Sequence, residues 1–179
     1  MTFSAIVVAA GSGSRAGGDK QYRMLAGKPV VRWSVEALRG AGAGEIVVVV
    51  APGAEARMAQ ALHGLAGWRT VAGGVERADS VRAGLASLAC APDAAVLIHD
   101  AARPFVPENV VLDLLEAVHE SGAATLALPV ADTLVRAEAG GNWGDLTPRE
   151  GLWAVQTPQA FRRELILKAH AQAVTDGFA

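Results

Sequence analysis

Apolar runs of strand length alternate with helix-like segments along most of this chain. The runs are too continuous for a sheet with one solvated face, so we expect both faces of the sheet to be covered. They occupy residues 4–10, 45–51, 68–73, 94–101 and 123–130, and amphipathic segments at 29–42, 54–65, 77–89 and 109–122 lie between them. This alternation predicts an α/β fold, a three-layer sandwich whose sheet is mostly parallel and whose crossovers are right-handed.

The pattern changes after Val130. Residues 131–161 carry charges, glycines and two tryptophans but no helical stripe, and a connection of this length is unusual inside a compact domain. We predict a protruding β-arm over about 131–155, with "AGGNWG" at its tip and "GLWAVQ" returning to the sheet. A last helix is predicted over 162–174, and residues 1–179 are expected to form a single domain.

The charge and cysteine content argue against several classes of protein. A formal net charge of −2 gives no overall field that favours nucleic acid or an anionic membrane surface, so any anion site must be local. The single cysteine, Cys90, leaves no internal disulfide, and no metal-ligand spacing of Cys and His occurs. The N-terminal apolar run is far shorter than the roughly 20 residues of a membrane span. We therefore expect a soluble, cytoplasmic protein with no nucleic-acid or membrane partner.

A glycine-rich segment follows the first apolar run. The stretch "AAGSGSR" begins at Ala9, and the cations in and after it are Arg15, Lys20, Arg23 and Lys28. Glycines after a parallel strand let the backbone approach a ligand, and successive N–H groups there can bind an anion. The pattern is neither the dinucleotide fingerprint G-x-G-x-x-G nor the phosphate loop G-x-x-x-x-G-K-[ST]. It is typical of a polyphosphate site, although a solvated basic turn accounts for the same residues.

The stretch "HDAARPF" ends another apolar run and holds a carboxylate and a cation three residues apart. One interpretation is a local ion pair between Asp100 and Arg103. The other is a metal site, because Mg²⁺ is typically held by one or two carboxylates together with substrate phosphate oxygens. His99 is interpreted as a core or packing residue with no catalytic role.

The stretch "GGVERADSV" places Gly73 and Gly74 after a predicted strand and Arg77, Asp79 and Ser80 near a predicted helix start. These residues suit a helix N-cap with a tight connection. They also suit a site for a flat base, because backbone groups left open by glycine can contact the edge of a base.

Taken together, these motifs resemble those of the 2-C-methyl-D-erythritol 4-phosphate cytidylyltransferase family. The matching stretches are "AAGSGSR" with "KQY", "GG" with "RADSV", "HDAARP", "ADT" at 131–133 and "GLWAVQTPQAF". They follow the family's order and spacing from about Ala5 to Asp176. The resemblance implies a Rossmann-like nucleotidyltransferase fold and the transfer of CMP from CTP to methylerythritol phosphate, with Mg²⁺ and with release of pyrophosphate.

The resemblance also assigns roles to individual residues. Arg15 and Lys20 match the catalytic pair that neutralises the α-phosphate, and Asp100 matches the magnesium-associated carboxylate. The other matches are nucleotide-binding at Ala9, Ala10, Gly11, Gly13, Gly74, Ser80 and Asp100, and substrate-binding at Arg103, Thr133, Arg149 and Thr157. The family's arm crosses to a partner subunit, so the resemblance implies a homodimer in which Arg149 and Thr157 are candidates to serve the neighbour's site.

Three departures from the family pattern stand out. Asp19 stands where proline is usual, and Val75 replaces a frequent acidic residue; we expect both to be tolerated. The family's final segment, which bears "NIK", has no counterpart after Ala179. We therefore expect this chain to be the N-terminal part of a longer protein, weakly active or inactive in this form.

Three alternatives remain at this stage. A ribitol-phosphate cytidylyltransferase shares the glycine loop and "QTPQ", but "HDAARP" and "GLWAVQTPQ" favour methylerythritol phosphate. A non-catalytic nucleotide-binding module would bind CTP without releasing pyrophosphate, and Lys20 argues against it. The third is the transferase part of a bifunctional protein fused to a cyclodiphosphate synthase, which no residue here tests.

Overall fold

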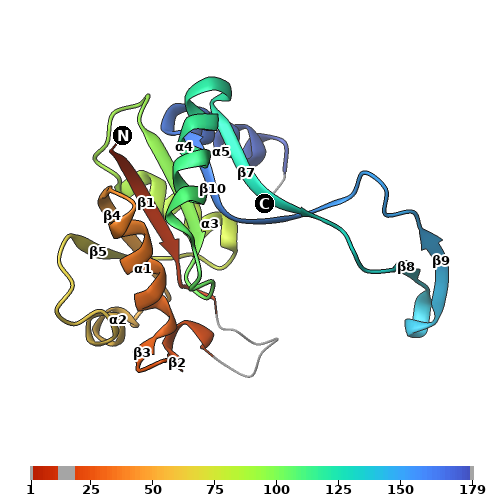
Figure 1. Ribbon diagram of the computed structural model, residues 1–179, viewed down its shortest axis with the longest axis horizontal. Helices are drawn as coiled ribbons and strands as arrows, with labels where there is room; N and C mark the ends of the chain where they lie inside the picture. Colours follow the sequence, from red (N-terminus) through yellow and green to blue (C-terminus); the bar gives the residue numbers. More distant parts are fainter. Residues whose placement is uncertain (1, 12–18, 178–179) are drawn as a thin grey trace.

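A six-stranded sheet forms the centre of the molecule, with helices on both of its faces (Figure 1). The computed structural model describes residues 2–11 and 19–177. The strand order is β5-β4-β1-β6-β10-β7. These strands are β1 (Phe3–Val8), β4 (Ala43–Val50), β5 (Trp68–Ala72), β6 (Ala95–Asp100), β7 (Ala123–Pro129) and β10 (Trp153–Arg162).

Most of the sheet is parallel. β1 pairs in parallel with β4 and with β6, and β4 pairs in parallel with β5. β10 runs antiparallel to both β6 and β7. The mostly parallel α/β fold predicted from the sequence is therefore confirmed, and the ends of the five predicted apolar strands differ from the observed ends by at most two residues.

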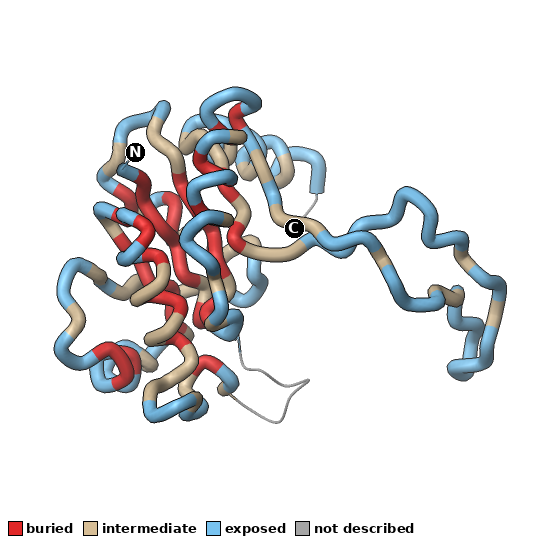
Figure 2. The backbone as a smooth tube through the Cα atoms, in the orientation of Figure 1, coloured by how far each residue is buried: buried red, intermediate tan, exposed pale blue. Residues whose placement is uncertain are grey.

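Alternate residues of the central strands contribute to two hydrophobic cores, one on each face of the sheet. In β1, Ala5 and Val7 pack into one core, whereas Ile6 packs into the other. Figure 2 shows the buried residues concentrated in the sheet and in the helix faces against it. The strands are buried on both faces, which is why their sequences read as continuous apolar runs.

In the described part of the chain, five α-helices cover the two faces. α1 (Val30–Gly40), α2 (Glu55–Ala61) and α4 (Glu108–Ser121) pack on the first core, and α3 (Arg77–Ser87) and α5 (Arg163–Thr175) pack on the second. The second helix was predicted to reach residue 65 but ends at Ala61, shortly before Gly64 takes the left-handed φ of 80°. None of the helices in the described ranges combines the length and the apolar character needed to cross a bilayer.

The predicted β-arm projects away from the sheet (Figure 1). It consists of β8 (Leu134–Ala137) and β9 (Trp143–Thr147), paired antiparallel, with the short 3₁₀ turn η3 (Ala139–Gly141) at the tip. No residue from 131 to 155 is buried. The arm therefore contributes nothing to the two cores.

Strand β10 extends further than the sequence indicated. Only its first residues were expected to return to the sheet, yet it continues through Pro158 and lies between β6 and β7. Its ladder with β7 is irregular between Val155 and Gln159. Proline has no N–H to donate and is tolerated in a sheet at such an irregularity, so its presence concealed this strand.

Candidate active site

The carboxyl ends of the parallel strands meet at one edge of the sheet, as parallel pairing requires. After β1, β5 and β6 the chain enters loops at this edge, and hydrogen bonds to neighbouring strands hold the first residues of these loops. The amide of Ala9 donates to the carbonyl of Val49 at 2.8 Å, and the amide of Ala101 donates to the carbonyl of Val8 at 3.0 Å. The three loops that carry the predicted site motifs therefore lie along one edge of the sheet. Ligands of open α/β sheets bind beyond this edge.

Lys20 lies on a short 3₁₀ turn, η2 (Lys20–Tyr22), that is tied to the end of β1. The buried side-chain amide of Gln21 donates to the carbonyl of Ala9 at 2.9 Å and to that of Gly11 at 3.4 Å. Lys20 itself is exposed. Its backbone is thus fixed beside the glycine segment, while its ammonium group is open to a ligand. Arg15 and Gly13 lie outside the described residues.

Two residues of these loops, Asp19 and Val75, differ from the family pattern, and the structure shows what surrounds each of them. Asp19 forms an ion pair with Arg57, whose guanidinium lies 3.9 Å from the centre of the Tyr22 ring. This ion pair ties residue 19 to helix α2. Val75 has a side chain that is 96% exposed, so no packing demands another residue there.

The glycine pair at 73 and 74 is held tightly against the start of α3. The amide of Gly74 donates to Ser80 Oγ at 3.3 Å, and Ser80 is buried. A Cβ on Gly73 would lie 2.6 Å from that hydroxyl oxygen, and a Cβ on Gly74 would lie 2.2 Å from the Cβ of Asp79. Neither position has room for a side chain. The connection therefore presents bare backbone next to Ala10.

The start of α3 has the predicted cap. Glu76 is the N-cap residue, and its amide donates to Asp79 Oδ2 at 3.0 Å in a reciprocal capping box. Asp79 also forms an ion pair with Arg82. Asp79 is thus engaged in helix structure, and the amides of Gly73 and Gly74 also donate within the chain, to the Val50 carbonyl at 2.7 Å and to Ser80 Oγ at 3.3 Å.

Asp100 accepts hydrogen bonds from two arginines. Arg77 donates to Oδ1 through Nη2 at 2.9 Å and through Nε at 3.2 Å, and Arg103 donates to Oδ2 through Nε at 3.3 Å. Arg103 also donates to the side-chain oxygen of Gln156. Arg77 was not predicted to contact Asp100, because 23 residues separate them and no local pattern links them. The local ion pair with Arg103 is confirmed as one of these two contacts.

His99 is completely buried, and both of its ring nitrogens have partners. Nε2 lies 2.9 Å from the carbonyl oxygen of Arg103, and Nδ1 lies 3.2 Å from Thr157 Oγ1. Burial lowers the pKa of His99 most, and the Arg103 charge lowers it further, whereas the hydrogen bond to the Arg103 carbonyl and the Asp100 charge act in the opposite direction. The sequence indicated a core residue but gave no sign of these two bonds.

The structure does not bring all predicted residues together within one chain. Thr157 lies beside Asp100, whose amide donates to Thr157 Oγ1 at 3.2 Å. Thr133 and Arg149 lie on the arm, which extends away from this edge of the sheet (Figure 1). Arg149 donates to the carbonyl of Ala131, so it is bonded within the arm.

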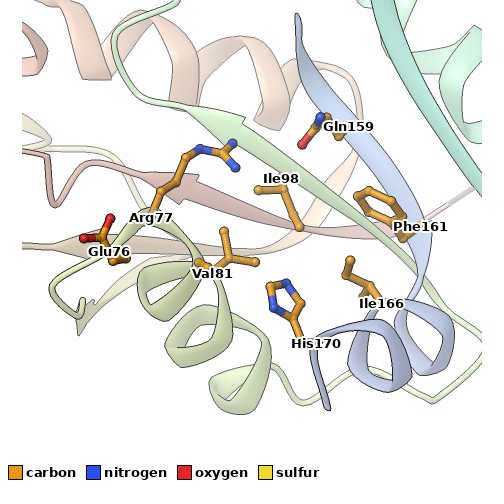
Figure 3. Close-up of a pocket in the computed structure, with 9 residues that line it drawn as sticks. Glu76, Arg77, Val81, Ile98, Gln159, Phe161, Ile166 and His170 are labelled. Atoms are coloured by element: carbon orange, nitrogen blue, oxygen red, sulfur yellow. The ribbon is translucent and has the colours of Figure 1, made fainter. Parts of the chain in front are cut away.

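A pocket of about 370 Å³ lies beside this edge, on the face that α3 and α5 cover. Figure 3 shows Arg77 reaching from the start of α3 over β6, with Val81, Ile98 and Phe161 beneath. Burial first, and the Arg82 charge second, lower the pKa of His170 on the pocket wall. The pocket is largely apolar at its base and charged where it adjoins Asp100.

The fold and this edge define a nucleotidyltransferase-like α/β protein, and comparison with known proteins places it more closely. The sequence profile of the 2-C-methyl-D-erythritol 4-phosphate cytidylyltransferase (IspD) family matches residues 3–179. This chain belongs to that family.

Relatives and solved structures agree with this placement. The chain is 54% identical over 174 residues to the bifunctional enzyme IspD/IspF of Caulobacter vibrioides, covering 96% of this chain and 45% of the relative. It is 49% identical over 178 residues to the 2-C-methyl-D-erythritol 4-phosphate cytidylyltransferase of Deinococcus radiodurans, covering 98% and 72%. The crystal structure of the corresponding Thermus thermophilus protein superposes with a TM-score of 0.82 at 37% identity, covering 100% of this chain and 79% of that one.

The lengths of these proteins differ from the length of this chain. It spans about half of the bifunctional Caulobacter relative. The bifunctional IspDF of Campylobacter jejuni, with a TM-score of 0.81 and 26% identity, is covered to 44% of its length, while 96% of this chain is matched. The match is therefore to the IspD portion of such proteins.

Proposed function

We propose that this protein transfers CMP from CTP to 2-C-methyl-D-erythritol 4-phosphate. The observation that carries the proposal is that the Lys20 turn, the bare glycine backbone and Asp100 converge at one sheet edge in a member of this family. A phosphate oxygen of the acceptor attacks the α-phosphorus of CTP and forms a new P–O bond. The bond from that phosphorus to the bridging oxygen breaks, and its electron pair leaves with pyrophosphate.

The chemistry explains why no nucleophile and base pair is needed. The acceptor phosphate is already an anion, so catalysis reduces to positioning and to stabilisation of charge on the α-phosphate. Lys20 is our candidate for the cation that stabilises this charge, together with Arg15. The exposed ammonium of Lys20 on an anchored turn supports this role.

The nucleotide would bind along the loops after β1 and β5. Ala9, Ala10 and Gly11, with Gly13, would contact the phosphates, and Gly74 and Ser80 would contact the cytosine edge. The crowding at the glycine pair supports this assignment, because only an unsubstituted backbone leaves a flat surface there.

Mg²⁺ fits this edge as an ion that arrives with the triphosphate. Among the described residues no group of three or more His, Cys, Asp or Glu side chains could hold a metal on its own. Asp100 offers one carboxylate, which is enough when phosphate oxygens supply the other ligands. The ion would add positive charge to the phosphates, and Asp100 would exchange its contacts with Arg77 and Arg103 to hold it.

The acceptor would bind at Arg103 and beside Thr157, and the arm would supply Thr133 and Arg149 to a second subunit. Exposed apolar side chains on the arm support a homodimer, because they need a cover that their own chain does not provide. Trp143 is 73% exposed and Leu146 is 66% exposed. A cytoplasmic location completes the proposal, since Cys90 is the only cysteine and no disulfide is required for stability.

A pyrophosphate-release assay tests the proposal, and it uses the protein as its gene encodes it, because residues 1–179 alone are expected to be weakly active or inactive. CTP is offered with methylerythritol phosphate and, separately, with ribitol phosphate, and CTP binding is measured in parallel. We expect pyrophosphate only with methylerythritol phosphate. CTP binding without pyrophosphate from either acceptor would contradict the proposal and support a nucleotide-binding module instead. The assay concerns the transfer step alone, not the second activity of bifunctional relatives.

A further inference from the structure

A chain of three hydrogen bonds joins β6, β10 and the loop after β6. The Arg103 carbonyl lies 2.9 Å from His99 Nε2, and His99 Nδ1 lies 3.2 Å from Thr157 Oγ1. The amide of Asp100 lies 3.2 Å from the same Oγ1. Two of these contacts use the Thr157 hydroxyl, which the family resemblance assigned to the substrate, whereas none of them uses the side chains of Asp100 or Arg103.

The chemistry of the groups fixes the direction of each bond. A carbonyl oxygen only accepts, so His99 Nε2 must carry the proton and donate to Arg103. Burial disfavours a second proton on the ring, so Nδ1 accepts, and the Thr157 hydroxyl donates to it. The Asp100 amide then donates to a lone pair of Thr157 Oγ1. The single proton of this hydroxyl is therefore directed at His99.

A side chain takes this place where the backbone pairing of β6 with β10 ends. β6 and β10 pair with Ile98 opposite Gln159, and two more residues in this register would place Asp100 opposite Thr157. The observed pairing stops at Gln159, before that point. The Thr157 hydroxyl accepts the Asp100 amide where the backbone pairing stops.

The same loop is anchored from its other side. Ser34, which is fully buried in α1, donates its hydroxyl to the carbonyl of Ala101 at 3.1 Å and is 3.3 Å from that of Arg103. The Asp100–Arg103 segment is thus held by β6, β10 and α1. The side chains of Asp100 and Arg103 therefore extend into the site from a backbone that is held in place.

We propose that His99 is a positioning residue, which acts through the Thr157 hydroxyl and the Arg103 carbonyl to hold Asp100 and Arg103 in the geometry that the reaction needs. The kinetic part of this inference rests on the proposed function. It gives Thr157 a supporting role within its own chain, because a hydroxyl whose proton is directed at His99 has none left for a substrate phosphate.

The bond directions can be tested without any assay of activity. In ¹⁵N-histidine-labelled protein, two-bond ¹H–¹⁵N spectra distinguish the two neutral imidazole tautomers. We expect one of the four histidines to be fixed with its proton on Nε2 and to change its spectrum in Thr157→Val. A proton on Nδ1 of that ring, or no histidine that responds to Thr157→Val, would overturn the proposal.

Steady-state kinetics tests the consequence. Thr157→Val keeps the side-chain shape and should lower kcat by about 10–100-fold and also raise KM for CTP, because small displacements of positioned groups cost up to about 10²-fold. Thr157→Ser should restore most of the rate. Thr70→Val, the same change in strand β5 at the opposite side of the sheet, is the matched control and should leave kinetics unchanged.

The double variant decides whether the two side chains act as one unit. His99→Phe with Thr157→Val should be slower than the slower single variant by no more than about twofold. Additive losses, or a Thr157→Val protein in which only KM for methylerythritol phosphate rises, would overturn the proposal. If His99→Phe does not fold, His99→Gln, which keeps a donor near the Nε2 position, replaces it in the cycle.

The two proposals fail in different ways. A wild-type protein that releases no pyrophosphate contradicts the proposed function, and the tautomer spectra then decide the His99 arrangement by themselves. Normal turnover with a proton on Nδ1 contradicts the positioning role alone.

Discussion

The sheet body and the arm are built on opposite principles. In the body, Val47, Val48 and Val49 of β4 are fully buried, and helices cover both faces. In the arm, no residue from 131 to 155 is buried, and the two-stranded ladder has Trp143 on its surface. A two-stranded hairpin alone is marginally stable in water. We therefore expect the body to be stable by itself, and the arm to gain a fixed conformation only when another surface covers it.

The candidate site divides along the same boundary. Lys20, Asp100 and Thr157 lie on the body and are fixed by hydrogen bonds between distant segments. Arg149 lies on the arm, and its side chain donates to the nearby Ala131 carbonyl. Under the proposed function, the geometry of the nucleotide side is set within one chain, and the geometry of the acceptor side would depend on where the arm docks.

A matched pair of leucine truncations gives the largest contrast. Leu97→Ala in β6 removes a fully buried side chain and should lower the free energy of unfolding by about 2–5 kcal/mol. Leu146→Ala in β9 should change it by less than about 0.5 kcal/mol at low protein concentration. Urea denaturation measures both. Equal losses would show that the arm belongs to the folding core and would contradict the difference drawn between the body and the arm.

The next largest effect concerns catalysis on the body. Lys20→Ala should lower kcat by about 10²–10³-fold while leaving the free energy of unfolding and CTP affinity nearly unchanged, because the ammonium acts on charge that develops in the transition state. Lys20→Arg should also be slow, since a planar fork does not replace a compact ammonium. Steady-state assays and CTP titration measure both variants.

Lys168→Ala is the control for this pair. Lys168 is an exposed lysine on α5, so its loss changes the net charge equally without touching the site. A Lys168→Ala protein as slow as Lys20→Ala would mean that the rate responds to overall charge, and Lys20 would lose its assignment.

Subunit mixing tests whether the arm serves a neighbour. Lys20→Ala and Arg149→Ala proteins are each expected to be nearly inactive. If Arg149 acts across a homodimer, half of the dimers in an equal mixture are mixed, each with one intact site, so about a quarter of wild-type activity should return. Exchange of subunits is followed by mass. Complete exchange without recovery would assign Arg149 to its own chain's site.

The sequence was informative where local patterns dictate structure. A strand buried on both faces must be apolar throughout, so both ends of β4 and β6 were predicted to within two residues. The contacts that assemble the site are long-range. His99 and Thr157 lie 58 residues apart, and Arg77 and Asp100 lie 23 residues apart. No local sequence pattern predicts either contact.

Family motifs predicted which residues gather at the edge but not how they are bonded. The motif containing Asp100 suggested a metal ligand or an ion pair with Arg103, and the second arginine came from a different motif altogether. The sequence predicted only that "GLWAVQ" returns to the sheet, whereas β10 continues to Arg162, and the irregularity of its pairing with β7 between Val155 and Gln159 depends on neighbouring strands.

The smallest predicted effect concerns the rim of the body, where surface contacts replace core packing. Glu36 on α1 accepts from Lys28 Nζ at 2.6 Å and from Arg32 Nε at 2.9 Å, which ties the β2–β3 hairpin (β2, Met24–Leu25; β3, Lys28–Pro29) to the helix. Burial raises the pKa of Glu36, but the hydrogen bonds and charges of these two cations together lower it by more, so the pKa lies below the usual glutamate value.

A depressed carboxylate pKa stabilises the folded state above the unfolded-state pKa, and the stabilisation is lost as the pH falls through the folded-state pKa. Glu36→Gln should therefore lower the free energy of unfolding at pH 7 by about 0.5–1 kcal/mol, as expected for a largely solvated ion pair, and by progressively less below pH of about 4. Urea denaturation across this range measures the difference. Glu150→Gln, which removes an exposed carboxylate from the arm, should change stability at neither end of the range. A loss of unfolding free energy in Glu36→Gln that does not depend on pH would mean that side-chain packing, not charge, holds the hairpin. The hairpin would then resemble the buried body and not the arm.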